Sequence, residues 1–80
     1  MEQQIVLDRV LAFLGKRFPR AEAISDTTRL ADSGMMDSLV VLELVMFVEE
    51  EFGLQVERGD LDRFDTAANI TDLVVSKQVG

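Results

Sequence analysis

Gly34-Met35-Met36-Asp37-Ser38-Leu39 leads directly into an apolar and acidic segment that ends at Phe52-Gly53. This stretch marks the point where a turn-rich connection meets a predicted helix, and it places one serine at that junction. We expect the helix to begin at Asp37 or Ser38. It should end at the glycine after Phe52, since glycine readily adopts the left-handed backbone that closes a helix.

The same region carries the whole net charge of the chain. From residue 31 to residue 57 there are seven acids and no lysine or arginine, whereas the rest of the chain carries eight acids and eight bases. The formal net charge of −7 therefore comes from this window. A concentrated negative field of this kind attracts cationic protein surfaces and steers their approach.

The composition describes a small globular domain without the usual catalytic side chains. The 80 residues are 48% hydrophobic and 29% charged, which predicts one domain over residues 1–80. Without cysteine or histidine the chain lacks thiolate ligands and the usual general base, so we expect neither catalysis nor a metal site. Acidity disfavours nucleic acid, and no segment resembles a membrane span or signal peptide. We therefore expect a cytoplasmic monomer.

The apolar spacing before the serine predicts one helix and a long connection. Gln3 to Arg17 has helical periodicity, and the connection from Pro19 to Gly34 is rich in turn residues. Ile24 and Leu30 are its apolar anchors. The expected inward stripe of the first helix is Val6, Val10, Phe13, Leu14 and Phe18.

The helix after Ser38 has two faces that differ in composition. One arc is predicted to face the core, namely Val41, Leu44, Val45, Val48 and Phe52. The opposite arc mixes large apolar side chains with acids, namely Leu39, Glu43, Met46, Phe47 and Glu50. A helix that served only solubility would not need apolar residues on its outer face.

Two further helical segments are predicted downstream. A short one from Gly59 to Phe64 should hold Leu61 and Phe64 against the core. The last should start after Thr66, whose hydroxyl can cap the free amides of Ala68 or Asn69. Its buried residues are expected to be Ile70, Leu73 and Val74.

Ser38 itself allows several interpretations. A hydrolase nucleophile would need an adjacent base, and the chain offers no histidine and only two lysines, both distant in sequence. A simple helix cap is possible, but Asp37 competes for that role. If Asp37 is the cap, the Ser38 hydroxyl points into solvent at a helix N-terminus, which favours an attached phosphate.

The run Asp37-Ser38-Leu39, followed by Glu43-Leu44-Val45-Met46 and Glu49-Glu50-Glu51-Phe52-Gly53, resembles the acyl carrier protein family. The resemblance implies an all-α four-helix bundle with a long first loop and a short third helix. It also implies that a phosphopantetheinyl transferase attaches a phosphopantetheine arm to Ser38. The arm's thiol would hold acyl or aminoacyl groups for a loading ligase and for downstream synthases or transferases.

The resemblance also implies partner-binding residues along the second helix. Asp37 would help to present Ser38 to the transferase. The partner-contact residues would be Leu39, Glu43, Met46, Phe47 and Glu50, with Glu49 and Glu51 as further candidates. The alternative for the acids is an ordinary solvated helix face, and for the apolar side chains it is cover by neighbouring residues.

The chain also departs from the carriers of fatty-acid synthesis. These typically have Leu-Gly-x before the Asp-Ser-Leu motif and a further acid just after it, whereas this chain has Gly34-Met35-Met36 before it and Val40 after it. The pattern is more similar to freestanding carriers of specialised polyketide, nonribosomal peptide or lipid-like pathways.

Two rival classes make different predictions. A calcium-binding loop built on Asp60, Asp62 and Asp65 would lack the glycine at its sixth position and has Thr71 where a bidentate glutamate is needed. A cofactor-free acidic docking adaptor would not use Ser38 at all. Replacing Ser38 with alanine would leave an adaptor functional and would inactivate a carrier.

Overall fold

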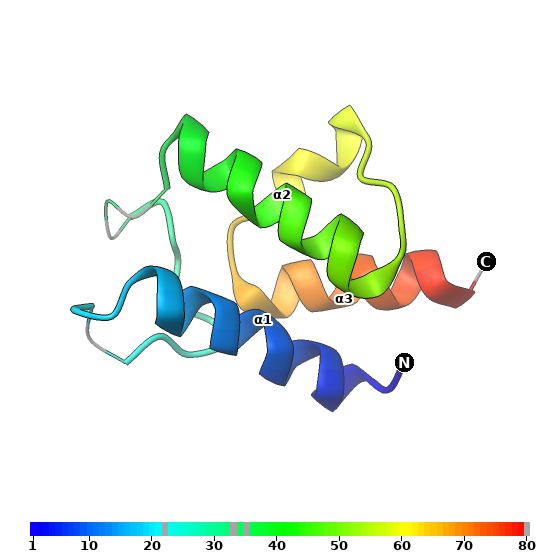
Figure 1. Cartoon of the computed structure of the whole chain (residues 1–80), viewed down its shortest axis with the longest axis horizontal. Coiled ribbons are helices and arrows are strands. Elements are labelled where there is room, and N and C mark those ends of the chain that lie inside the picture. Colours follow the sequence, from blue (N-terminus) through cyan, green and yellow to red (C-terminus); the bar gives the residue numbers. More distant parts are fainter. Residues whose placement is uncertain (22, 33, 35, 80) are drawn as a thin grey trace.

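The computed structural model describes residues 1–21, 23–32, 34 and 36–79. Within these residues the regular structure is entirely helical, with α1 (Gln3–Arg17), α2 (Ser38–Phe52), the 3-10 helix η1 (Arg58–Arg63) and α3 (Ala67–Val79). Figure 1 shows α2 above α1 and sloping in a similar direction, with α3 behind the lower end of α2 and both chain ends on the same side of the molecule. The predicted all-helical class and the four helical segments are confirmed.

The core lies between the three α-helices. One stripe of α1 is buried at Val6, Val10 and Leu14, each fully inaccessible to solvent. Other helices and connections contribute buried residues to the same cluster, namely Leu30, Leu44, Val48, Phe52, Phe64, Ala67, Ile70, Leu73 and Val74. Phe13, Phe18 and Ile24 are partly buried against it. The predicted inward stripe of the first helix and the apolar anchors of the connection are therefore confirmed.

The long connection is fixed to the beginning of α3. The N–H of Leu30 donates to the carbonyl oxygen of Asp65 at 3.0 Å, and the N–H of Ala68 donates to the carbonyl oxygen of Asp26 at 2.9 Å. Asn69 N–H donates to Thr66 Oγ1 at 3.1 Å, so the predicted cap of the last helix is confirmed. These bonds join segments far apart in sequence and set where the chain re-enters at α2. Met35 of the predicted motif lies outside the described residues.

The end of α2 is closed as the sequence predicted. Gly53 has a φ of 65°, a left-handed conformation in which a side chain would be strained, and its N–H donates to the Glu49 carbonyl at 3.0 Å. The Glu49 carboxylate also accepts from the N–H of Val56 at 2.9 Å. Glu49 therefore ties the link after α2 back to the helix.

The predicted inward arc of α2 is partly wrong. Leu44, Val48 and Phe52 are buried, but the fourth member of the buried line is Val40, which is 2% exposed. Val41 and Val45 are only half-buried. Because α2 is apolar on nearly every side, its own periodicity does not define one inward face, and the positions of α1 and α3 decide which residues are covered.

Two further side chains lie differently from expectation. The Phe47 ring, expected on the outer arc, stacks on Phe13 of α1 with 4.5 Å between ring centroids and contacts Phe52 edge-on at 5.9 Å. Leu61, expected against the core, is 41% exposed, whereas Phe64, the C-cap of η1, is buried. The aromatic contacts let Phe13 and Phe47 cover each other between α1 and α2.

Asp60 ties the short helix η1 to α3 and to the residue that precedes η1. Its carboxylate accepts from Lys77 Nζ of α3 and from the N–H of Glu57, both at 2.8 Å. The Glu57 carboxylate accepts in return from the backbone of Asp60, which completes a capping box. The Lys77 bond, followed by the Glu57 bond, holds the pKa of Asp60 below its ordinary value of 3.8.

We expect this arrangement to make stability depend on acid pH. A carboxyl whose pKa is lowered by folding stabilises the fold above its ordinary pKa, and this contribution is lost as pH falls through the folded-state value. Asp60→Asn should therefore flatten the fall of the unfolding free energy below about pH 4. Urea unfolding at several pH values measures it. Asp62→Asn, an exposed change in the same helix, should keep the wild-type slope; equal slopes for all three proteins would contradict the assignment.

Candidate functional site

Ser38 is the first residue of α2, and its side chain is exposed. The N-cap is Asp37, whose Oδ1 accepts from the N–H of Val40 at 2.9 Å. Asp37 has extended backbone, with φ −118° and ψ −179°. Capping is therefore done by Asp37, and within the described residues no hydrogen bond engages the Ser38 hydroxyl. A free hydroxyl lies at a helix N-terminus, where amides and the helix dipole favour an attached anion.

The cap predicts a separation between charge and stability at Asp37. Asp37→Ala should lower the unfolding free energy by about 1 kcal/mol, because the N–H of Val40 loses its acceptor. Asp37→Asn keeps an oxygen acceptor and should stay within a few tenths of the wild-type value. Urea unfolding of both variants is the measurement. Equal losses for both would show that the charge, and not the cap, stabilises this end of α2.

A groove begins beside Ser38. It has a volume of about 310 Å³ and lies between α2 and the segment that leads into η1. We call this cavity the Ser38 groove; its lining residues are Ser38, Val41, Leu42, Val45, Val56, Glu57, Arg58 and Leu61. The volume is at the lower end of the range of small-molecule sites. The aliphatic walls and the single hydroxyl at the end suit a flexible chain that starts at the serine.

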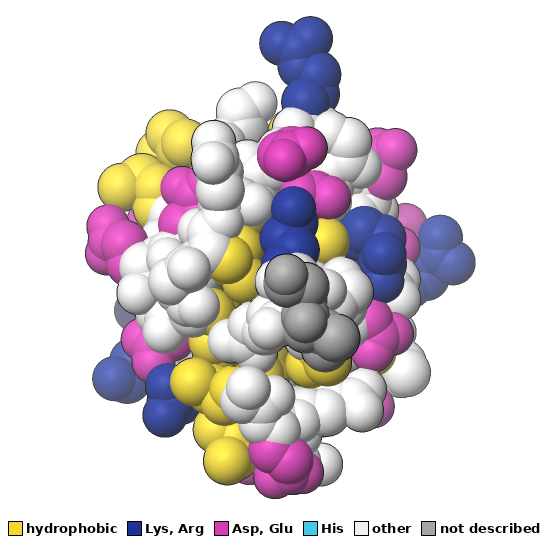
Figure 2. Space-filling view, turned by 90° about the vertical axis from the view of Figure 1, so that its right-hand side faces the viewer, with side chains coloured by type: hydrophobic (Ala, Val, Ile, Leu, Met, Phe, Trp, Pro, Cys, Tyr) yellow, Lys and Arg dark blue, Asp and Glu magenta, His cyan; other side chains and the backbone are white. Residues whose placement is uncertain are grey.

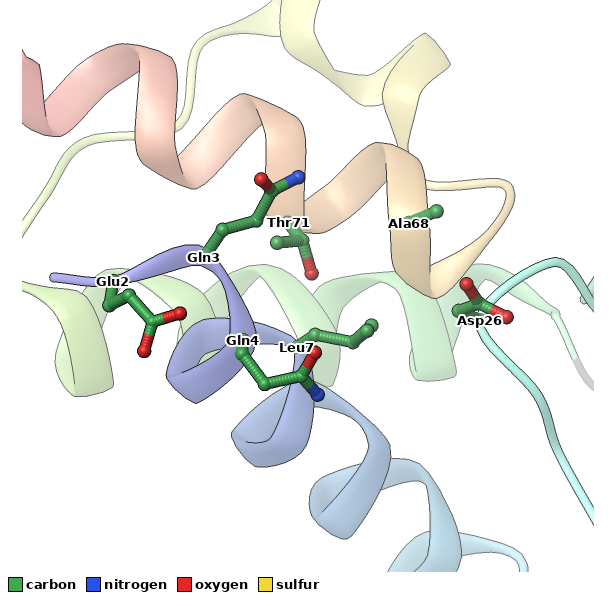
Figure 3. A pocket seen from close by; sticks show the side chains of 7 residues that line it. All are labelled: Glu2, Gln3, Gln4, Leu7, Asp26, Ala68 and Thr71. Atoms are coloured by element: carbon green, nitrogen blue, oxygen red, sulfur yellow. The ribbon is translucent and has the colours of Figure 1, made fainter.

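Two other cavities lie away from Ser38. One of about 260 Å³ is lined by Phe13 and Phe47 where α1 meets α2. The other, of about 240 Å³, lies between the beginnings of α1 and α3 (Figure 3). Figure 3 shows its carboxylates, Glu2 and Asp26, at opposite ends, so they do not converge on one point. No group of three or more acids able to hold a metal ion occurs within the described residues.

The acids of α2 differ in how they are engaged. Glu43 is half-buried and accepts from Arg17 Nε of α1 at 3.1 Å, and Glu51 pairs with Arg9 of α1 at 2.8 Å. Glu49 is bound to the backbone after the helix. Glu50 is exposed, and no ion pair engages it within the described residues. Of the predicted docking acids, Glu50 is therefore free, whereas a partner's cation must compete with Arg17 for Glu43.

Exposed apolar side chains follow one line along α2. Leu39 is 60% exposed, Leu42 is 55% exposed and Met46 is 50% exposed. Sequence reasoning identified Leu39 and Met46 but missed Leu42, although its spacing of three and four residues from them is a helical one. It also missed Arg58, since only the fold brings η1 close to Ser38.

The side of the molecule with the chain termini has a different character. Figure 2 shows acidic and basic side chains interspersed there with separate small apolar groups. In the described part of the chain, no helix is long and apolar enough to cross a membrane.

Comparison with known proteins identifies the family of the chain. Residues 4–74 match the family model described as "Phosphopantetheine attachment site". The chain is 29% identical over 76 residues to the acyl carrier protein of Saccharopolyspora erythraea, covering 94% of this chain and 80% of that protein. It is 27% identical over 78 residues to the acyl carrier protein of Thermosynechococcus vestitus, covering 96% of each.

A solved structure extends the agreement to the fold. The crystal structure of a Toxoplasma-specific mitochondrial acyl carrier protein superposes with a TM-score of 0.85 and 25% sequence identity, and the match covers 99% of this chain and 93% of that one. The predicted four-helix architecture is thereby confirmed. The chain belongs to the acyl carrier protein family, whose members are non-catalytic carriers that bear a phosphopantetheine group.

Proposed function

We propose that Ser38 is the residue to which a phosphopantetheinyl transferase attaches the phosphopantetheine arm of coenzyme A. The observation that carries this proposal is the division of roles at the start of α2. Asp37 caps the helix, so the exposed Ser38 hydroxyl is not needed for capping. The Ser38 groove starts at the same residue and supports a flexible group attached there.

The chain's own residues prepare the attachment without performing it. Asp37 fixes the first turn, and thereby the direction of the Ser38 side chain, and its carboxylate is available to the transferase at the exposed N-cap. The helix N-terminus favours the phosphodiester that results. When bound, phosphopantetheine supplies a thiol that can hold an acyl or aminoacyl group as a thioester. Val41 and Val45 then offer an apolar wall beside it.

Peptide mapping tests the position directly. Trypsin would leave Ser33 and Ser38 together, because residues 31–57 contain no lysine or arginine. A protease that cuts before aspartate separates them, since residues 32–36 contain Ser33 alone and residues 37–59 contain Ser38 as their only hydroxyl residue. After loading, the increment should lie on fragment 37–59. An increment on fragment 32–36 would contradict the proposal.

We also propose that partner enzymes approach α2. The proposed contact residues remain those predicted from the sequence, namely Leu39, Glu43, Met46, Phe47 and Glu50, with Leu42 added. Exposure supports Leu39, Met46 and Glu50 most directly. Phe47 has its ring stacked on Phe13, so its contribution would come through the edge of the cavity that both line.

A neutral exchange tests the apolar part of this surface. Met46→Gln should lower kcat/KM for transfer from coenzyme A by about three- to tenfold, because it removes apolar contact area without changing charge. Ile5→Gln is the matched control, since Ile5 is 43% exposed on α1. It should leave kcat/KM unchanged. Equal losses in both variants would contradict a docking surface on α2.

The proposal also covers the class of group that the chain carries and the kind of pathway that it serves. We infer that residues 1–80 form a carrier domain that serves a specialised acyl or aminoacyl pathway, from the departures around the Asp37-Ser38-Leu39 motif. The partners would be a loading ligase and downstream synthases or transferases. The cytoplasmic location stays a prediction; the Toxoplasma neighbour is a mitochondrial protein.

A further inference from the structure

Arg58 is the one basic side chain among the residues that line the Ser38 groove. It is exposed, and no acid pairs with it within the described residues. Four other cations are paired with acids, namely Arg9 with Glu51, Arg17 with Glu43, Arg29 with Asp32 and Lys77 with Asp60, and none of these four lines the Ser38 groove. Arg58 is thus an unneutralised positive charge beside an otherwise acidic helix start.

The segment that carries Arg58 is anchored to the rest of the fold, and the adjacent acid, Glu57, is engaged in a hydrogen bond. Asp60 ties η1 to Lys77 of α3 at 2.8 Å, and Phe64 buries the other end of η1 with 5% exposure. The Glu57 carboxylate, adjacent in sequence, accepts from the backbone of Asp60 in the capping box. Arg58 therefore extends from an anchored segment, while its nearest acid in sequence is already hydrogen-bonded.

A phosphodiester on Ser38 would add negative charge next to Asp37 and Glu57. No lysine or arginine occurs from residue 31 to residue 57, so this window itself offers the anion no counter-charge. A guanidinium group is a planar donor that binds phosphate oxygens in a paired geometry. The first cation after this window, Arg58, lines the same groove as Ser38.

We propose that Arg58 is a positioning residue whose guanidinium pairs with the phosphodiester formed at Ser38 and directs the beginning of the arm along the Ser38 groove. This inference rests on the proposed attachment at Ser38. It gives a residue of η1 a role in placing the arm, and Arg58 forms no covalent bond. Since the pair is exposed to solvent, added salt should weaken it.

Nuclear magnetic resonance of the apo and phosphopantetheine-loaded protein tests the pairing. With a free thiol, the arm carries its charge on the phosphate alone, so no cargo contributes. The Nε–H signal of Arg58, assigned from its absence in Arg58→Lys, should shift on loading and return toward the apo position in high salt. The Arg63 signal, from the same short helix but outside the groove lining, should not move.

The phosphorus signal of the loaded protein gives the reciprocal measurement. Arg58→Gln should shift the phosphodiester resonance, Arg58→Lys should shift it less, and Arg63→Gln should leave it at the wild-type position. Equal spectra for wild type and Arg58→Gln, or equal shifts for Arg58→Gln and Arg63→Gln, would overturn the inference. Absence of the arm from Ser38 in the mass spectrum would instead overturn the proposed function, so the two failures are distinguishable.

Discussion

Replacing Leu44 with alanine is expected to destabilise the domain more than any surface change considered above. Leu44 is fully buried in the middle of α2 and belongs to the core cluster shared by α1, α2 and α3. A buried leucine truncated to alanine costs about 2–5 kcal/mol, from lost burial and from the cavity left behind. A domain of this size has only about 5–10 kcal/mol in total. We expect the melting temperature to fall by at least about 10 °C.

Leu42 provides the matched control for this prediction. It is two residues away on the same helix and is 55% exposed, so Leu42→Ala is the same chemical change on the outer side. Its unfolding free energy should change by less than about 0.5 kcal/mol. Urea unfolding of both variants measures the difference. Equal destabilisation would mean that the inward face of α2 has been assigned wrongly.

Ser38→Ala is expected to have the largest effect on function, with almost none on the fold. The cap belongs to Asp37, and the exposed Ser38 hydroxyl contributes no hydrogen bond within the described residues. The unfolding free energy should therefore stay within about 0.5 kcal/mol of wild type. Loading should be lost completely, because the attachment atom is absent. Complementation of a strain that lacks the carrier should fail with Ser38→Ala and succeed with Ser33→Ala.

The positions of the helices could be predicted because their signals are local. Helix ends depend on neighbouring residues: Asp37 supplies an acceptor, Gly53 adopts φ 65° and Thr66 caps α3. The periodicity of α1 also identified its buried stripe, since Val6, Val10 and Leu14 follow one another at intervals of four residues. Ser38 was singled out by the resemblance of Asp37-Ser38-Leu39 to the acyl carrier proteins, and the cap at Asp37 leaves its hydroxyl exposed; its role as the attachment residue stays a prediction.

The remaining features depend on contacts between distant segments. Apolar residues occupy most faces of α2 itself. The packing of α1 and α3 therefore decides that Val40 is buried and Val41 is only half-buried. The Phe47 ring stacks on Phe13, which lies 34 positions earlier in the sequence. Glu43 forms an ion pair with Arg17, which lies 26 positions earlier. Arg58 lines the Ser38 groove because the fold places η1 there, with Asp60 bonded to Lys77 of α3. A single sequence carries no local signal for these pairings.

The central claim is that Ser38 carries the arm, and the intact mass of the protein tests it most directly. Purified wild type, Ser33→Ala and Ser38→Ala would each be incubated with coenzyme A, magnesium and a promiscuous phosphopantetheinyl transferase. Wild type and Ser33→Ala should each gain a single phosphopantetheine increment, and Ser38→Ala should gain none. An increment on Ser38→Ala, or no increment on any of the three proteins, would contradict it.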